Sequence, residues 1–186
     1  MKFFGDSYDL VKRCLLVWLR PIGEWAVHPM FAEPVADAEA AAFGAFLGAP
    51  LVSTVPLSYE TDRRSYFDWA GDNRHLFFDP NTGVRMDGSQ PRNDPDYIYS
   101  SELKARVVAR PGSLTLVFDQ SVARGAEREA VGAKLQHFSE QGIAGFAYTS
   151  QACFLLLGGQ AALVQRAYRA VLDQSKLPET RFVLAA

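Results

Sequence analysis

The chain has 186 residues, a formal charge of −2 and a pI of about 5.9, so it carries no overall basic field to hold nucleic acid. Hydrophobic residues make up 48% and charged residues 22%, and no repeat or linker divides the sequence. These values favour a single globular domain over residues 1–186.

Two features concern the compartment. Asp6 and Asp9 interrupt the N-terminal segment, which therefore does not resemble a signal peptide, and no apolar run approaches the roughly 20 residues of a membrane span. Cys14 and Cys153 are the two cysteines, and both are expected to be buried, unpaired thiols. We therefore expect a cytoplasmic protein without a membrane partner.

The local pattern predicts that the chain begins with a strand and a helix. The bulky run at 2–5 is typical of a buried strand, and a helix is expected over 7–20, ended by Pro21. Lys12 and Arg13 are expected to face solvent. Four residues form the apolar stripe that is expected to be buried: Leu10, Cys14, Val17 and Trp18.

Strands and helices then alternate along the chain. Further strands are predicted at 25–28, 51–55, 75–78 and 114–118. Helices are predicted at 37–47, within 59–69, from 100 to 108, around 131–138 and, after a hairpin of 145–149 with 154–157, around 163–172. The tail at 181–184 is expected to add an edge strand. The pattern predicts an α/β fold, a three-layer Rossmann-like sandwich with a mostly parallel sheet, a C-terminal antiparallel hairpin and an extra C-terminal helix.

A polar stretch rich in Gly, Pro, Asn and Asp follows the strand at 75–78 and runs to Tyr97. Loops of this length in compact domains usually carry function, so we expect a lid. Arg85 and Arg92 lie in it and would suit a phosphate-bearing substrate, because Arg binds phosphate in a bidentate manner. The alternative is a solvated, charge-balanced surface, since many aspartates accompany the arginines.

The predicted order of strands, helices and closing hairpin resembles the class I S-adenosylmethionine-dependent methyltransferases, from Phe3 to about Gly158. The resemblance implies that S-adenosylmethionine binds at Gly5 and Asp6, where that family has a glycine-rich loop. It also implies a ribose-binding acid at Glu33, after the second strand. The departure is that Gly5 is a single glycine where the family has two or three.

A second part of the resemblance is the motif Asp79-Pro80-Asn81-Thr82, which follows the fourth predicted strand. It is similar to the Asp-Pro-Pro-aromatic motif of the methyltransferases that modify amino groups, with Asn81 and Thr82 in place of the second proline and the aromatic residue. The resemblance implies that Asp79 and Asn81 are catalytic and that the substrate is a nucleotide or nucleic acid.

The residues themselves also allow a metal site. Asp6, Asp79 and Asp119 each follow a predicted strand, and ligands of open parallel sheets bind beyond the carboxyl ends of the strands. If the three carboxylates converge, they would bind Mg²⁺ and support phosphodiester cleavage. Each aspartate has a plain alternative, since Asp6 and Asp119 are suited to capping helices and Asp79 to an ordinary turn.

Three functions therefore remain open. The first is a methyltransferase-like enzyme centred on Asp79, and the second is a Mg²⁺-dependent nuclease or phosphoesterase. The third is an inactive domain that binds a ligand or partner. His28, at a predicted strand end, is the one histidine considered as a general base, and a structural role is the alternative.

Overall fold

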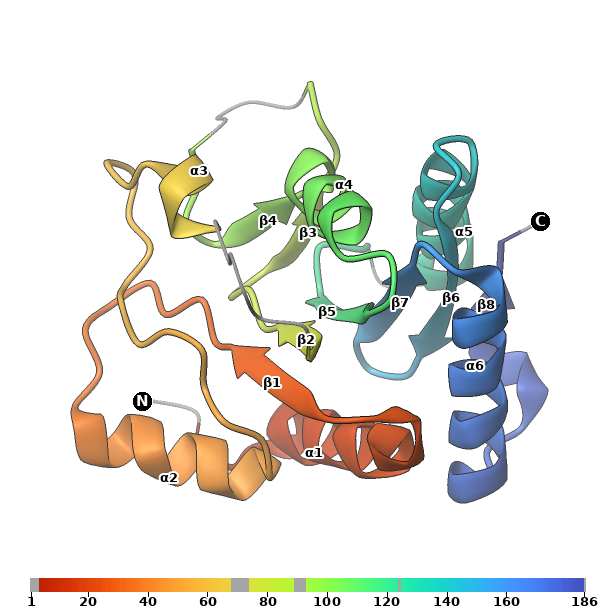
Figure 1. Ribbon diagram of the computed structural model, residues 1–186, viewed down its shortest axis with the longest axis horizontal. Coiled ribbons are helices and arrows are strands. Elements are labelled where there is room, and N and C mark those ends of the chain that lie inside the picture. Colours follow the sequence, from red (N-terminus) through yellow and green to blue (C-terminus); the bar gives the residue numbers. More distant parts are fainter. Residues whose placement is uncertain (1–3, 68–73, 89–92, 124, 186) are drawn as a thin grey trace.

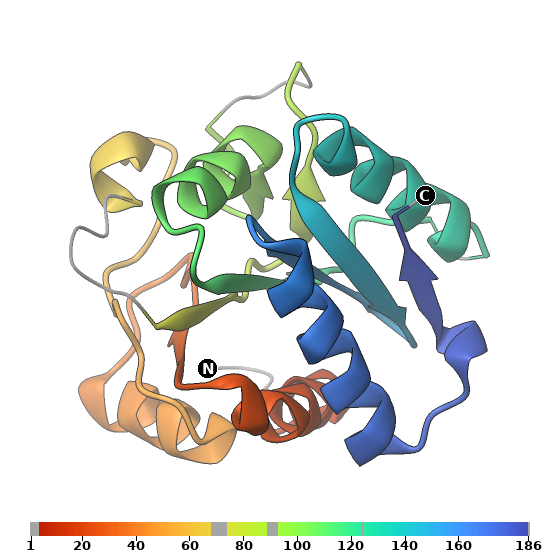
Figure 2. The same ribbon diagram turned by 45° about the vertical axis from the view of Figure 1, so that its right-hand side comes forward.

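The computed structural model describes residues 4–67, 74–88, 93–123 and 125–185. In this part of the chain the fold is α/β, with helices on both faces of a mixed six-stranded sheet (Figures 1 and 2). The strands lie in the order β1-β2-β5-β7-β6-β8, and β3 and β4 form a separate two-stranded sheet. No helix of the described residues is both long and apolar enough to span a membrane.

The helices of the described residues agree closely with the predicted ones. Their bounds are α1 Ser7–Leu19, α2 Asp37–Leu47, α3 Arg63–Tyr66, α4 Ser100–Ala109, α5 Glu127–Ser139 and α6 Ala161–Ser175. The strands are β1 Trp25–His28, β2 His75–Phe78, β3 Gly83–Arg85, β4 Tyr97–Tyr99, β5 Leu114–Asp119, β6 Ala144–Thr149, β7 Cys153–Gly158 and β8 Phe182–Leu184. Two short 3₁₀ turns, Arg20–Ile22 and Glu179–Arg181, complete the described elements.

The six-stranded sheet is mixed rather than mostly parallel. β1 pairs in parallel with β2, and β2 with β5. The β6–β7 hairpin is antiparallel as predicted, but β7 lies between β5 and β6 and is antiparallel to both, and β8 is antiparallel to β6. The antiparallel pairs therefore outnumber the parallel ones, because the hairpin folds back into the sheet instead of extending its edge.

The two faces of the sheet have separate hydrophobic cores. One core lies between the sheet and α1, α2 and α6, and the other lies under α4, α5 and the β3–β4 pair (Figure 2). Side chains of a strand alternate between the faces, so on β5 Leu116 and Phe118 belong to the first core and Val117 to the second. This alternation decides where the polar groups at the strand ends point.

Helix α1 presents a different face to the core from the one predicted. Leu15, Leu16 and Leu19 are buried, whereas Leu10 and Val17 are 51% and 40% exposed. Cys14 is also exposed, so its expected burial is wrong; Cys153 is buried as expected. The helix is rotated in this way because Asp9 and Lys12, on the same side as Leu16 and Leu19, pair in the interior and are themselves buried. Solvent exposure of Lys12 was therefore a wrong prediction.

The first predicted strand is not found where the chain is described. Met1, Lys2 and Phe3 lie outside the described residues, and Phe4 and Gly5 form a turn before α1. The side chain of Asp6 accepts hydrogen bonds from the backbone N–H groups of Tyr8 and Asp9 at 2.8 and 3.1 Å and caps the helix.

The segment predicted as a strand at 51–55 forms a single parallel bridge, between Leu51 and Val27 of β1. The N–H of Val27 donates to the carbonyl of Pro50 and the N–H of Val52 donates to the carbonyl of Val27, both at 2.9 Å. Pairing goes no further because β1 ends at His28, one residue beyond the bridge. This bridge covers part of the outer edge of β1, which is otherwise an edge of the sheet.

The long polar stretch after β2 is not a structureless lid. It contains β3, which pairs in parallel with β4 at Gly83–Arg85 and Tyr97–Tyr99. β3 and β4 pack with their inner side chains, Val84 and Ile98, into the second core. The stretch therefore joins the body of the domain, although Arg92 lies outside the described residues.

Candidate functional site

The candidate site lies where β1, β2 and β5 end at their carboxyl termini beside the first turn of α1. Ligands of parallel sheets bind at this edge because loops and helix ends meet there without side-chain layers above them. Asp79 directly follows β2, the middle strand of the three, and its N–H donates to the carbonyl of His28 at the end of β1 at 2.9 Å. Asp79 is buried, with 8% of its surface exposed.

A buried lysine links Asp79 to helix α1. The ammonium of Lys12 donates to Asp79 Oδ2 at 2.9 Å and to Asp9 Oδ1 at 3.0 Å. Asp9 also accepts a hydrogen bond from the N–H of Gly5 at 2.9 Å, through Oδ2. Lys12 Nζ also lies 4.6 Å from the ring centroid of Phe118 on β5. The ammonium therefore contacts residues of α1, of β5 and of the segment after β2.

The formal charge of the cluster is negative, because one ammonium, that of Lys12, pairs with Asp79 and Asp9 while the charge of Asp6 also acts on Asp79. Burial lowers the pKa of Lys12, but Asp79 and Asp9 outweigh it, so the pKa is raised and Lys12 stays protonated. Burial raises the pKa of Asp79, Lys12 opposes the rise, and the charges of Asp9 and Asp6 add to it. An additional positive charge at this edge would therefore be stabilised.

Asp119 does not join this cluster. On β5 it follows the alternation of Val117 and faces α5, whereas Asp79 follows that of Phe77 and faces α1. Lys134 of α5 donates to Asp119 Oδ2 at 2.6 Å, and three donors from Val84 and Ser121 bind Oδ1. The predicted convergence of all three aspartates is therefore wrong for Asp119, because it lies one residue beyond the position of β5 that is level with Asp79 and so faces the opposite side of the sheet.

No group of three His, Cys, Asp or Glu side chains within the described part of the chain is arranged to hold a metal ion. Lys134 uses its three hydrogens on Asp119, the carbonyl of Val84 and the hydroxyl of Ser121, at 2.6 to 2.8 Å. The buried Asp119–Lys134 pair thus joins β5, α5 and β3, and its role is structural.

The proposed substrate clamp is occupied where it is described. Arg85 forms an ion pair with Asp94 at 3.1 Å, and its guanidinium lies 3.6 Å from the ring centroid of Tyr97. These contacts hold β3 against β4, so a phosphate would have to compete with them. Arg92 is outside the described residues.

Two other residues implied by the methyltransferase resemblance, Asn81 and Glu33, are at the surface. Asn81 is exposed and its amide donates to Asp96 Oδ1 at 3.0 Å, and Glu33 is exposed after β1. Gly5 and Asp6 belong to the cluster through the N-terminus of α1 rather than through a strand. Of these residues, the structure brings Gly5, Asp6 and Asp79 together.

His28 is buried beneath the same edge, on the face of α4, and its ring contacts Tyr66, Phe67 and Phe78. Burial lowers its pKa to about 3, so the ring is neutral near neutral pH. Its Nδ1 accepts the N–H of Met30 at 3.1 Å, which helps to hold Met30 at a φ of +46°. His28 therefore supports a strained turn after β1 and is not a surface base.

Comparisons with models of protein families, with curated proteins and with solved structures found no match.

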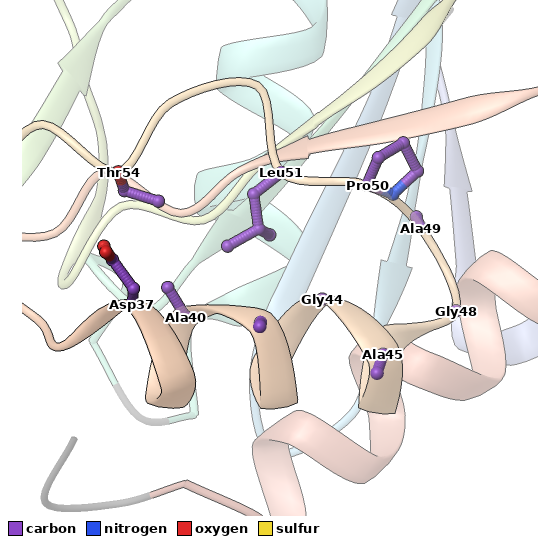
Figure 3. Close-up of a pocket in the computed structure, with 10 residues that line it drawn as sticks. Asp37, Ala40, Gly44, Ala45, Gly48, Ala49, Pro50, Leu51 and Thr54 are labelled. Carbon is purple, nitrogen blue, oxygen red and sulfur yellow. The ribbon is translucent and has the colours of Figure 1, made fainter.

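A separate surface depression of about 570 Å³ lies between α2 and the segment that follows it (Figure 3). Its lining is mostly small and apolar, and Leu51 points toward the helix from the facing segment. Asp37 and Thr54 supply the polar side chains at one end. None of its lining residues belongs to the cluster of Lys12 and Asp79, so we do not assign it to the same site.

Two residues of the cluster, Asp9 and Lys12, were not identified from the sequence as site residues. The available signal was their helical spacing, because Asp9, Lys12, Leu16 and Leu19 recur at intervals of three and four and so share one face. A charged pair on the same face as two leucines indicates a buried ion pair, and a buried ion pair needs further partners inside the fold.

Proposed function

We propose that the chain is a methyltransferase-like enzyme domain that binds S-adenosylmethionine at the carboxyl ends of β1, β2 and β5 and acts on a nucleotide or nucleic acid. The proposal depends mainly on one observation, the buried carboxylates of Asp79 and Asp9 around the single ammonium of Lys12, with the charge of Asp6 also acting on Asp79. It lies at the edge of the sheet where open α/β folds bind their ligands.

The charge of the cluster supports this ligand class. S-adenosylmethionine carries a permanent sulfonium charge, which the excess of carboxylates would stabilise. A bare phosphate at the same place would meet three carboxylates and one ammonium that is already paired. Acidic side chains at this edge therefore favour a cationic ligand over an anionic one, and a nucleotide substrate would have to place its phosphates away from Asp79.

The topology supports the same proposal. The hairpin that closes the sheet places β7 antiparallel between β5 and β6, and a closing hairpin is characteristic of the family that the sequence resembles. The strand beside β2 is β1, so under this proposal the cofactor loop is the turn at Pro29 and Met30 rather than Gly5 and Asp6. Met30 already has the left-handed backbone that such loops usually obtain from glycine.

Bound S-adenosylmethionine would supply a methyl group. The residues of the chain that would act beside it are Asp79, which holds a negative charge, and Lys12, which orients that carboxylate through Oδ2. Asn81 lies two residues after Asp79 and is exposed. Its side chain would contact the substrate rather than the cofactor.

The test is a titration with S-adenosylmethionine and, as the matched ligand, S-adenosylhomocysteine, which lacks the sulfonium charge. At a hundredfold excess over Kd, a ligand that binds only the native state raises the unfolding midpoint by about 5–10 °C for a domain of this size. We expect a shift with both ligands and a larger one with S-adenosylmethionine. Asp79→Asn should remove the difference between them, and the exposed Asp173→Asn should not.

The alternative outcomes are distinct. A shift with Mg²⁺ or Mn²⁺ and none with either adenosyl ligand would replace the proposal with a metal-dependent nuclease or phosphoesterase. No shift with any of them would leave a domain that binds another ligand or a partner without catalysis. If the adenosyl ligands do bind, the substrate is identified by transfer of labelled methyl groups to nucleotides or nucleic acid. This transfer should be lost in Asp79→Asn.

A further inference from the structure

The position of the Lys12 ammonium between two carboxylates has a consequence for metal binding. Its Nζ lies 2.9 Å from an oxygen of Asp79, which directly follows β2, and 3.0 Å from an oxygen of Asp9 on α1. The side chains are 10%, 8% and 7% exposed for Lys12, Asp79 and Asp9. The ammonium is therefore fixed by the fold and is not a loosely held surface charge.

A divalent cation would use the same oxygens. Mg²⁺ and Ca²⁺ bind one or two carboxylates at roughly 2.0–2.6 Å and complete their coordination with water. A cation at that distance from Asp79 Oδ2 and Asp9 Oδ1 would overlap the ammonium, so the two cannot be present together. Two carboxylates that come from different elements and face one point are otherwise a suitable pair of ligands.

The second buried lysine shows what this arrangement requires. Lys134 also pairs with a buried aspartate, but the oxygens around it belong to one carboxylate, a carbonyl and a hydroxyl. The other oxygen of Asp119 already accepts from the N–H of Val84 and from the N–H and hydroxyl of Ser121. Removal of Lys134 would leave a single carboxylate whose second oxygen is occupied.

We propose that Lys12 is a built-in cation that fills a divalent-metal position between Asp9 and Asp79, so that the site is complete without a metal and excludes one. This role concerns the same carboxylates as the proposed function but does not depend on it, because it holds whichever ligand the site takes. Lys12 acts through Asp79 and is a positioning residue.

The test is to replace the ammonium and measure metal binding directly. Mn²⁺ and Ca²⁺ are titrated calorimetrically into the wild type, Lys12→Met and the matched control Lys134→Met. We expect no binding by the wild type and one site in Lys12→Met with Kd of about 0.1–1 mM, the range of weak protein calcium sites. Lys134→Met should gain no site, and Lys12→Met with Asp79→Asn should lose the one gained.

Each other result counts against the proposal. Mn²⁺ binding by the wild type that is lost in Asp79→Asn would show that Lys12 does not exclude metals. A folded Lys12→Met without a metal site, or an equal gain in Lys134→Met, would also overturn it. If Lys12→Met is unfolded, circular dichroism with added Mn²⁺ or Ca²⁺ decides, since folding on addition supports the proposal and its absence refutes it.

The outcome is separate from that of the proposed function. One test measures S-adenosylmethionine binding and the other measures Mn²⁺ and Ca²⁺ binding with and without the Lys12 ammonium, so either proposal can fail while the other holds. Lys12→Arg gives a further distinction, because it restores the positive charge and should exclude Mn²⁺ again.

Discussion

The carboxylate of Asp119 lies directly against the backbone of Gly83, so that a Cβ atom at Gly83 would collide with Asp119 Oδ1. Gly83 has a φ of +142°, and it starts the strand that brings Val84 to the same carboxylate. The close approach of β3 to β5 therefore depends on the missing side chain at this position.

Gly83→Ala should lower the free energy of unfolding by about 3 kcal/mol or more, because it combines backbone strain with a clash against a fixed, buried carboxylate. Gly88→Ala is the matched control, since Gly88 also has a positive φ, of +93°, but its Cβ would meet no atom within 4 Å. It should cost about 1 kcal/mol. Urea denaturation of both variants measures the difference, and equal losses would mean that the approach to Asp119 is unimportant.

Asp119→Asn should destabilise the fold by about 3–5 kcal/mol, because it leaves the ammonium of Lys134 buried without its charge partner. Only 11% of the Lys134 side chain is exposed, and none of the Asp119 side chain. Combining Asp119→Asn with Lys134→Met should recover part of the loss, since no unpaired charge remains. Denaturant unfolding of the two single variants and the double variant forms the cycle, and additive losses would contradict a direct pair.

His28 should make the stability fall as the pH falls below its ordinary pKa of 6.5. Its pKa in the fold is about 3, so between pH 6.5 and 3 the unfolded chain binds a proton that the native ring does not. The contribution is fully present above pH 6.5 and is lost at roughly 1.4 kcal/mol per pH unit below it. The dependence of the unfolding free energy on pH between pH 6 and 4 should be weaker in His28→Asn than in the wild type. The control is His137→Asn, at a half-buried position of α5, which should keep the wild-type dependence.

The two thiols should differ in reactivity. Cys14 is exposed on α1, whereas Cys153 is buried on β7 and burial raises its pKa to about 12. The thiolate is the reactive form, so one thiol per native chain should react rapidly with a disulfide reagent at pH 8 and the second only after unfolding. Cys14→Ser should remove the rapid phase, and a rapid phase that persists would show that Cys153 is accessible.

The helices and most strands were predicted from the sequence because local signals define them. The spacing of apolar residues, the cap at Asp6 and the glycine at the end of α2 are visible without knowledge of the fold. The prediction of a strand at 51–55 was wrong because apolar and β-branched residues form a strand when a partner strand lies beside them, and the sequence pattern does not show whether one does. Within the described residues the segment makes one bridge, between Leu51 and Val27, and this does not extend into a ladder.

The site was harder to predict for a different physical reason. That Asp79 follows a strand is visible in the sequence, but whether it faces α1 or α5 depends on the register of β2 within the sheet. Asp119 was predicted to lie beside Asp79 because it also follows a strand. A difference of one residue in position along a strand, however, turns the side chain to the other face of the sheet. Lys12 was assigned to solvent because lysines usually are, and its burial requires the two carboxylates that only the fold brings together.

The bridge at Val27 has a consequence for how the molecule behaves in a crowded solution. An uncovered β1 would offer a row of free donors and acceptors to a strand from any neighbouring chain, which is a common route to aggregation. The carbonyl of Pro50 already accepts from the N–H of Val27, the N–H of Val52 already donates to the carbonyl of Val27, and Pro56 ends the segment shortly afterwards. A segment that is too short to form a strand thus protects this edge of the sheet from pairing with a strand of another copy of the protein.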